Sequence, residues 1–292
     1  MREALQGDYS FYYEKTIVLL VKQKGNRYRH RVIGIHADVL TSLKVCSSEV
    51  RGNTLFYSSW NDVSAEWVSL LNAGEVNSEH ELQACSGAID CVLSNHFCRF
   101  LVVPWSDAFF VQESMTGYLR AIFSEVYGDA GGSLDYVCQD AAYGQPRVVC
   151  GVEHDFLNDL KIQCSQNQLR FNTCRPYLDV AFEYFLPQMR TREGIFVLVE
   201  KNMLSILAWD KQGVLEVDHE SYEEKWCDAL GAWLERNLLM RNEAKPVHIA
   251  CPPSWRESSE EGREGWHYLE WKGKAKDLVL ENPHFALTVC LL

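Results

Sequence analysis

A histidine flanked by two carboxylates is the most reaction-like cluster in the sequence. Glu153-His154-Asp155 follows an apolar segment that ends at Val152 and precedes an amphipathic segment. A neighbouring carboxylate raises the pKa of a histidine, which makes the histidine a better general base. Acidic residues at the junction between a strand and a helix also cap the helix and complement its positive end. Both interpretations remain open, and the position in the chain favours capping.

The sequence lacks the common motifs for phosphate binding and hydrolysis. It contains no G-x-x-x-x-G-K-[ST] loop, no G-x-S-x-G elbow and no H-E-x-x-H pair. The glycine cluster at 128–132 follows a predicted helix, whereas a phosphate cradle lies between a strand and the helix that follows it. This cluster therefore indicates the end of a helix and a loop. His80-Glu81 lacks a second histidine one turn later, so it does not predict a zinc peptidase.

The cysteines predict neither a metal site nor a disulfide framework. There are 11 of them, and no two are spaced as C-x-x-C. A structural zinc site usually needs two close pairs, so we expect no bound metal. Cys91 and Cys150 lie in apolar segments, where a thiol behaves as a small core residue. Reduced, buried thiols are typical of a cytosolic protein, and we assign them no function.

The composition is that of a folded, acidic protein. The chain has 292 residues, 28 Lys+Arg and 40 Asp+Glu, and a net charge of -12. The length fits one two-lobed fold or two domains. The negative charge argues against a nucleic acid as the main ligand. No apolar stretch approaches the roughly 20 residues that span a bilayer. The first residues also lack the apolar segment of a signal peptide, so we expect a cytoplasmic protein without membrane insertion.

Strands and helices alternate along the chain. A hairpin is predicted from Thr16–Val21 and Tyr28–Ala37, and a further strand is predicted at Thr54–Ser58. The spacing of apolar residues at 63–71 predicts a helix. Further strands are expected at 88–94, 97–103, 134–139, 147–152, 169–174, 194–199, 204–209, 214–218, 247–251, 266–272 and 285–291. Helices are expected at 111–126, 155–166, 176–185 and 222–240. This order, with strands before helices on both sides of residue 190, predicts an α/β protein with two lobes of similar plan.

The order of four segments resembles a known family. They are Ala88–Trp105, Ile122–Gly128, Val148–Leu160 with its continuation through Leu178, and Gly194–Leu207. Together they resemble the cytoplasmic actin-like platform proteins of type IV pilus and type II secretion machines, the PilM and GspL type. The resemblance implies a two-lobed actin-like fold of the RNase H-like (ASKHA) superfamily, with mixed sheets flanked by helices. It implies a first lobe at 8–190, a small inserted subdomain at about 104–146, and a second lobe with a C-terminal tail at 191–292.

The sequence departs from the active members of this superfamily at the two hairpins that bind nucleotide. Active members place an Asp and glycines at these tips, where the carboxylate positions a metal and bare amides surround the phosphates. By hairpin position, the first tip here carries Ser10, Phe11 and Tyr12, and the second carries Glu200, Lys201 and Asn202. Neither tip has a glycine, and bulky rings at the first would fill the space for phosphates. We therefore expect a degenerate nucleotide site, no nucleotide cofactor and no ATP hydrolysis.

Two functions from different classes follow from the resemblance. The first is a non-catalytic scaffold at the inner face of a bacterial membrane, which joins a bitopic membrane subunit to an assembly ATPase. Its expected peptide site is the strand edge with Phe97, Arg99, Phe100 and Val102, where an extended segment adds to the sheet.

The alternative function is an ATP-dependent phosphotransferase of the sugar or acetate kinase type. Glu153, Asp155 and Glu200 would then surround the nucleotide. An unrelated α/β protein whose pattern matches by chance is the third interpretation, and the sequence leaves it open.

Overall fold

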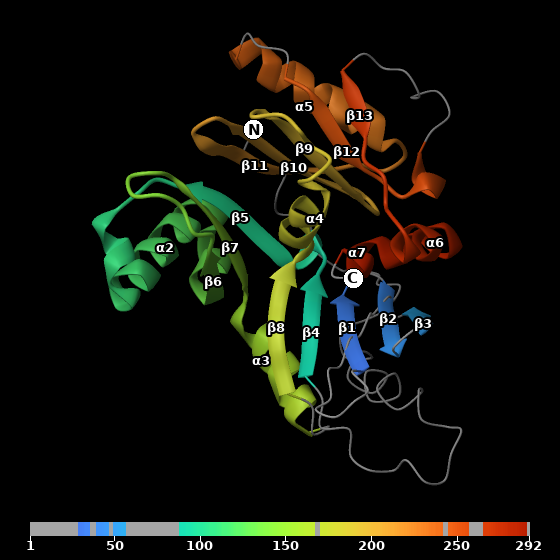
Figure 1. Cartoon of the computed structure of the whole chain (residues 1–292). Helices are drawn as coiled ribbons and strands as arrows, with labels where there is room; N and C mark the ends of the chain where they lie inside the picture. The colour runs from blue at the N-terminus through green and yellow to red at the C-terminus, as the bar shows by residue number, and fades with distance from the viewer. Residues whose placement is uncertain are drawn as a thin grey trace. The chain divides into compact units, whose positions relative to one another are not determined.

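The structure is a computed structural model that describes residues 29–35, 39–46, 49–56, 88–166, 170–241, 245–256 and 265–290 (Figure 1). The chain divides into two compact units. The first unit comprises Met1–Val92 and Lys161–Cys174, and the second comprises Leu93–Leu160 and Arg175–Leu292. The lobe boundaries expected from the sequence, 8–190 and 191–292, and the insert at about 104–146 stay predictions.

The sheet of the first unit has the strand order β3-β2-β1-β4-β8. β1 pairs antiparallel with β2, with Arg29 opposite Cys46. β2 in turn pairs antiparallel with β3, with Val39 opposite Phe56. The Asp90 carboxylate on β4 accepts hydrogen bonds from Asn172 and Thr173 on β8, both at 2.6 Å. The bounds of the strands are β1 Arg29–Ile35, β2 Val39–Cys46, β3 Glu49–Phe56, β4 Ala88–Leu93 and β8 Arg170–Pro176.

Strand β1 has a described neighbour on each side. We expected Thr16–Val21 to pair with Tyr28–Ala37. In the described sheet, β1 lies between β2 and β4. Thr16–Val21 itself, and the helix expected at 63–71, lie outside the described residues.

A three-stranded sheet and one helix form a small subdomain within the second unit. The sheet order is β5-β7-β6, with β7 antiparallel to both neighbours. Leu119 and Phe123 of α2 pack on Val103, Leu134 and Val149 of the sheet. The bounds are β5 Cys98–Val103, α2 Gln112–Tyr127, β6 Leu134–Cys138 and β7 Arg147–Glu153, followed by α3 at His154–Gln166.

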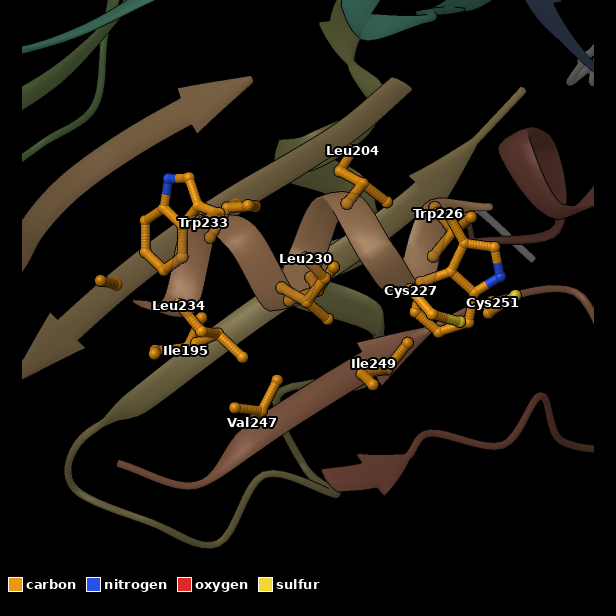
Figure 2. Close-up of a cluster of buried hydrophobic side chains, with 14 residues drawn as sticks. Ile195, Leu204, Trp226, Cys227, Leu230, Trp233, Leu234, Val247, Ile249 and Cys251 are labelled. Carbon is orange, nitrogen blue, oxygen red and sulfur yellow. The ribbon is translucent and has the colours of Figure 1, made fainter. Parts of the chain in front are cut away.

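The main core of the second unit lies between a five-stranded sheet and α5 (Trp226–Arg241). The sheet order is β11-β10-β9-β12-β13. Alternate residues of the strands and residues at helical spacing on α5 meet in one cluster, as Figure 2 shows for Leu230 and Leu234 of the helix above Val247 and Ile249 of β12. The bounds are β9 Gly194–Glu200, β10 Met203–Asp210, β11 Gly213–Ser221, β12 Val247–Ala250 and β13 Trp266–Tyr268.

Strand β9 is buried along its whole length because helices cover both of its faces. Its residues from Gly194 to Glu200 are all buried. Ile195 and Val197 face α5, whereas Phe196 contacts Phe182 and Phe185 of α4 (Tyr177–Phe185), with ring centroids 5.5 and 6.4 Å apart. A continuous apolar strand is typical of this position. The turn that follows β9 is thus held by a rigid support.

The C-terminal strand expected at 285–291 is wrong. The chain there forms α6 (Lys274–Glu281), a short 3-10 helix at Pro283–Phe285 and α7 (Ala286–Val289). The Asn282 side chain caps the 3-10 helix by accepting a hydrogen bond from the His284 amide. All four residues of α7 are buried. A short, mostly apolar segment carries no periodicity that distinguishes a buried helix from a buried strand.

Gly131 marks a close approach of two backbone segments and gives a testable prediction. It lies in the 3-10 helix Gly128–Ser133 that follows α2, where an added Cβ would lie 2.4 Å from the backbone C and O atoms of Phe123. Backbone atoms cannot move aside, so we expect Gly131→Ala to lower the free energy of unfolding by about 2–3 kcal/mol. Urea denaturation followed by circular dichroism measures this loss.

Gly117 provides the matched control for Gly131. It lies within α2, the helix that precedes Gly131, and an added Cβ meets nothing within 4 Å. Gly117→Ala should stabilise the protein by about 0.5–1 kcal/mol because alanine loses less backbone entropy on folding. Equal effects of the two substitutions would contradict the steric argument.

Candidate functional site

The second predicted hairpin tip is present where the sequence places it. Glu200 ends β9, Lys201 and Asn202 form the turn, and Met203 begins β10. Asn202 has a φ of 62°, in the left-handed region that asparagine tolerates better than most residues. The residues Ser10, Phe11 and Tyr12 of the other predicted tip lie outside the described residues, so their role stays a prediction.

The Glu200 carboxylate is buried and hydrogen-bonded by the turn that follows β4. Only 1% of Glu200 is exposed. The Ser94 hydroxyl donates to Oε1 over 2.5 Å and the Asn95 side-chain amide donates to Oε2 over 2.7 Å. The Asn95 backbone N–H lies 3.3 Å from both oxygens. A buried carboxylate is stable only when its oxygens accept such charge-assisted bonds, so both of its oxygens are already used here.

Asn95 joins the hairpin tip to two further elements. Its Nδ2 also donates to the Ser205 hydroxyl of β10 over 3.0 Å. Its Oδ1 accepts a hydrogen bond from the Leu178 amide at the start of α4, again over 3.0 Å. The side chain is 1% exposed and uses both of its donor hydrogens and its acceptor. Asn95 therefore fixes the turn after β4, the tip of β9 and β10, and the first turn of α4 in one arrangement.

His219 on β11 ends this chain of hydrogen bonds. The Ser205 hydroxyl oxygen accepts from Asn95 and lies 3.0 Å from Nδ1 of His219. The pKa of His219 is lowered to about 4, mainly by burial; Asp218 opposes this shift, and Arg99 contributes to it. We name the set Ser94, Asn95, Glu200, Ser205 and His219 the polar anchor.

The backbone of the hairpin tip is held as well. The Tyr222 hydroxyl donates to the Glu200 carbonyl over 2.6 Å, and the Tyr222 amide donates to the Asn202 carbonyl over 3.1 Å. Nε2 of His96 lies 3.0 Å from the Lys201 carbonyl. These contacts place Tyr222 beside the tip and outside α5, which begins at Trp226 and not at Tyr222 as the sequence predicted. The tip is thus fixed through both its side chain and its backbone.

The residues expected at the peptide site differ in exposure. Phe100 of β5 is 4% exposed and its ring lies 5.4 Å from that of His219, so its side chain belongs to the interior and offers no contact surface. Phe97 is half-buried and stacks on Phe156 at 4.9 Å. Arg99 donates to the carbonyls of His96 and Cys98. Val102 is half-buried. The expectation of a peptide site at β5 thus stays a prediction that excludes the Phe100 side chain.

The carboxylates of the kinase interpretation do not form one cluster. Glu153 and Asp155 are exposed, whereas Glu200 is buried. His154 lies at the start of α3 and contacts the exposed Asp135 of β6, with 3.0 Å between Nδ1 and Oδ1. Across the part of the chain that the structure describes, no group of three His, Cys, Asp or Glu residues could hold a metal ion.

The cysteines with described side chains are free thiols, and most are buried. Burial raises the pKa of Cys164 and that of Cys251 to about 12, and it raises the pKa of Cys91 well above the usual value. Thiols of this kind are unreactive because the nucleophilic form is the thiolate. Packing accounts for them without a catalytic role.

The sequence analysis singled out Glu200 but missed its partners. From the sequence, Ser94 and Asn95 were interpreted only as a polar turn between two strands and Ser205 as a strand residue, and His219 fell just after the expected strand at 214–218. The contacts to Glu200 and Ser205 join positions 105–110 residues apart in the sequence. No local spacing signals such contacts. The one available signal was the presence of small polar residues, Ser94 and Asn95, between two strongly apolar segments.

Comparisons with known proteins identify the fold. No model of a protein family matches the sequence, and no curated protein matches it. Among solved structures, the chain is similar to the cytoplasmic domain of EpsL, an inner membrane component of the type II secretion system of Vibrio cholerae. The TM-score is 0.54 at 12% identity, over 89% of this chain and 93% of that one. A PilM-PilN type IV pilus biogenesis complex gives a TM-score of 0.53 at 11% identity, over 88% and 96% of the two chains. The chain therefore has the actin-like fold that its sequence segments predicted.

Proposed function

We propose that the protein is a non-catalytic scaffold of a bacterial type IV pilus or type II secretion-like assembly. It would lie in the cytoplasm at the inner membrane, held there through a bitopic membrane subunit, and would join that subunit to an assembly ATPase. The similarity to the cytoplasmic domain of EpsL and to a PilM-PilN complex supports the kind of machine. Among the described residues, no helix combines the length and the apolar character needed to cross a bilayer.

The saturation of Glu200 is the observation that carries the non-catalytic part of the proposal. The hairpin tip that positions a metal in active members here offers one carboxylate, and Ser94 and Asn95 occupy both of its oxygens. Releasing Glu200 to hold a metal would leave the buried donors of Ser94 and Asn95 unpaired. Each buried donor without a partner costs about 1–3 kcal/mol. The tip therefore serves as a structural joint in this chain.

The backbone of β5 is the proposed site for the membrane subunit. β5 is an edge strand of its sheet. The Cys98 amide donates to the Asn95 carbonyl, and the Phe100 carbonyl accepts a hydrogen bond from the Tyr127 hydroxyl over 2.9 Å. These two backbone groups therefore face away from β7 and already have hydrogen-bond partners. In an antiparallel edge strand, the backbone N–H and C=O groups of every second residue point away from the sheet. Val102 follows Cys98 and Phe100 in this alternation, so its backbone groups point outward as well. An extended segment of the membrane subunit would pair there by strand addition.

Nucleotide titration distinguishes a scaffold from a phosphotransferase. We expect the melting temperature to stay unchanged with millimolar Mg-ATP or Mg-ADP, because neither oxygen of Glu200 is open to a metal. A ligand at about 100 times its Kd stabilises the folded state by about 2.7 kcal/mol, which is a shift of several degrees for a protein of this size. Mg²⁺ alone and ATP with EDTA serve as controls.

A shift of that size with Mg-ATP, absent in both controls, would contradict the non-catalytic scaffold. The scaffold itself is tested by purification of the tagged full chain from membranes solubilised in detergent. We expect an inner-membrane protein with a short cytoplasmic segment and an assembly ATPase to copurify. Recovery of neither protein would contradict the proposed role.

A further inference from the structure

An exposed group of aromatic side chains lies at one end of the small subdomain. We name Trp105, Phe110, Val111 and Tyr143 the aromatic patch. Phe110, Val111 and Tyr143 are 68%, 54% and 76% exposed, and Trp105 is half-buried beside them. The Trp105 ring lies 4.8 Å from that of Tyr143 and 6.0 Å from that of Phe110. Contiguous exposed apolar groups of this kind mark interaction surfaces, and Trp and Tyr are enriched among the residues that dominate binding.

Both segments that carry the aromatic patch are internally hydrogen-bonded. The Ser106 hydroxyl accepts from the Ala108 amide over 3.2 Å and begins the 3-10 helix Asp107–Phe110. In the connection between β6 and β7, the Gln145 amide donates to the Ala142 carbonyl over 3.1 Å. Gly144 lies in this turn with a φ of 79°, which glycine adopts without strain. The rings are therefore presented in a fixed arrangement, which lowers the entropy lost on binding.

The charges around the aromatic patch are negative. Asp107 and Glu113 each lie three residues from Phe110, and Asp140 lies three residues before Tyr143; all three are exposed. Only two basic residues occur between 104 and 147, Arg120 and Arg147. Arg147 is already placed over the ring of Phe109, 4.8 Å from its centroid. The patch thus combines exposed aromatic faces with carboxylates, which together attract a cation.

We propose that the aromatic patch docks an extended segment of a protein partner that carries arginine or lysine. Cationic side chains would lie on the faces of Trp105 and Tyr143 and meet the carboxylates of Asp107 and Asp140. A second copy of this chain fits poorly, because it would bring the same carboxylates against one another. Anionic lipids and nucleic acids are repelled for the same reason. This partner would be one of the proteins that the chain joins in its proposed scaffold role, on which the assignment rests.

The test is a titration of the purified full chain with labelled synthetic peptides. The probe is an extended peptide of repeated Ala-Arg-Ala-Pro units carrying fluorescein, read by fluorescence anisotropy. We expect saturable binding that Trp105→Ala weakens by about tenfold, the size expected for the loss of a partly desolvated cation–π contact. The double variant Phe110→Ser/Tyr143→Ser should weaken it as much. Since both of its positions are exposed, this variant keeps the fold even where Trp105→Ala does not.

Charge and position provide the controls. The same peptide with glutamate in place of arginine should not bind, and Asp107→Lys/Asp140→Lys should weaken the arginine peptide by about tenfold. The double variant Leu215→Ser/Leu280→Ser removes exposed apolar side chains elsewhere, 39% and 56% exposed in the wild type, and should bind like the wild type. Three results would overturn the proposal: no binding at millimolar peptide, equal binding of the glutamate peptide, or unchanged binding of the arginine peptide by the variant Phe110→Ser/Tyr143→Ser. So would self-association in sedimentation that this double variant abolishes.

Failure of the aromatic-patch proposal and failure of the scaffold role give different experimental results. The peptide titration uses the purified chain alone, whereas the scaffold role is tested by copurification from membranes. Failure of the titration with copurification retained overturns the assignment of the aromatic patch and leaves the scaffold. Peptide binding without any copurified membrane protein or ATPase overturns the scaffold and leaves a basic ligand at the aromatic patch.

Discussion

Glu200→Ala should lower the free energy of unfolding by about 3–5 kcal/mol, the range found when one partner of a buried charged network is removed. The substitution leaves the Ser94 hydroxyl, the Asn95 amide N–H and one Asn95 side-chain hydrogen buried without their acceptor. Glu200→Gln should cost about 2 kcal/mol or more. It replaces one acceptor oxygen by a donor that faces another donor. Urea denaturation followed by tryptophan fluorescence measures both losses.

Glu224 supplies the matched control, because it is an exposed glutamate of the same unit. Glu224→Ala should change the free energy of unfolding by less than about 0.5 kcal/mol. The sign of the Glu200→Ala effect separates the two functions. A carboxylate kept for ligand binding commonly destabilises the folded state, so its removal is neutral or stabilising. Stabilisation by Glu200→Ala would contradict the structural role of the polar anchor and reopen the catalytic interpretation.

Local patterns predicted the elements that are long or strongly apolar. The strands at 194–199 and 204–209 and the helix at 111–126 were predicted within one or two residues of β9, β10 and α2, because continuous apolar segments and helical spacing leave little choice. β2 was missed, since Val39–Cys46 mixes Thr, Ser and Lys with its apolar residues. The fold itself came from the order of four segments in a resemblance and not from any one of these patterns.

The candidate site was only half predictable, for a physical reason. The position of Glu200 at a hairpin tip follows from local turn chemistry, but its role depends on what packs against it. Because Ser94 and Asn95 turn next to this tip in the folded chain, the same carboxylate is a structural acceptor and not an open ligand. Phe100 shows the opposite case. Phe100 looked like a contact residue of an edge strand, yet its side chain packs beside His219.

The stability of the protein should fall as the pH falls from about 6.5 to about 4, through His219. Burial lowers its pKa to about 4 in the folded state, against 6.5 for an unperturbed histidine. Above pH 6.5 the ring is neutral in both states and contributes no slope. Below 6.5 the unfolded chain binds a proton that the folded chain refuses, so stability is lost until the folded ring protonates near pH 4. At 1.36 kcal/mol per pKa unit, the full loss is about 3 kcal/mol.

His219→Asn isolates this contribution from that of the carboxylates, which titrate in the same range in both proteins. Asparagine offers a side-chain amide that can both donate and accept, so a hydrogen bond to the Ser205 hydroxyl is kept where Nδ1 of the ring now lies 3.0 Å away. The variant should be less stable at pH 7 because it loses packing against Phe100, but about 2 kcal/mol of the difference between pH 7 and pH 5 should disappear. An equal loss between these two pH values in both proteins would show that His219 accepts a proton without disturbing the network. In that case burial would not hold the pKa of His219 below its usual value in the folded protein.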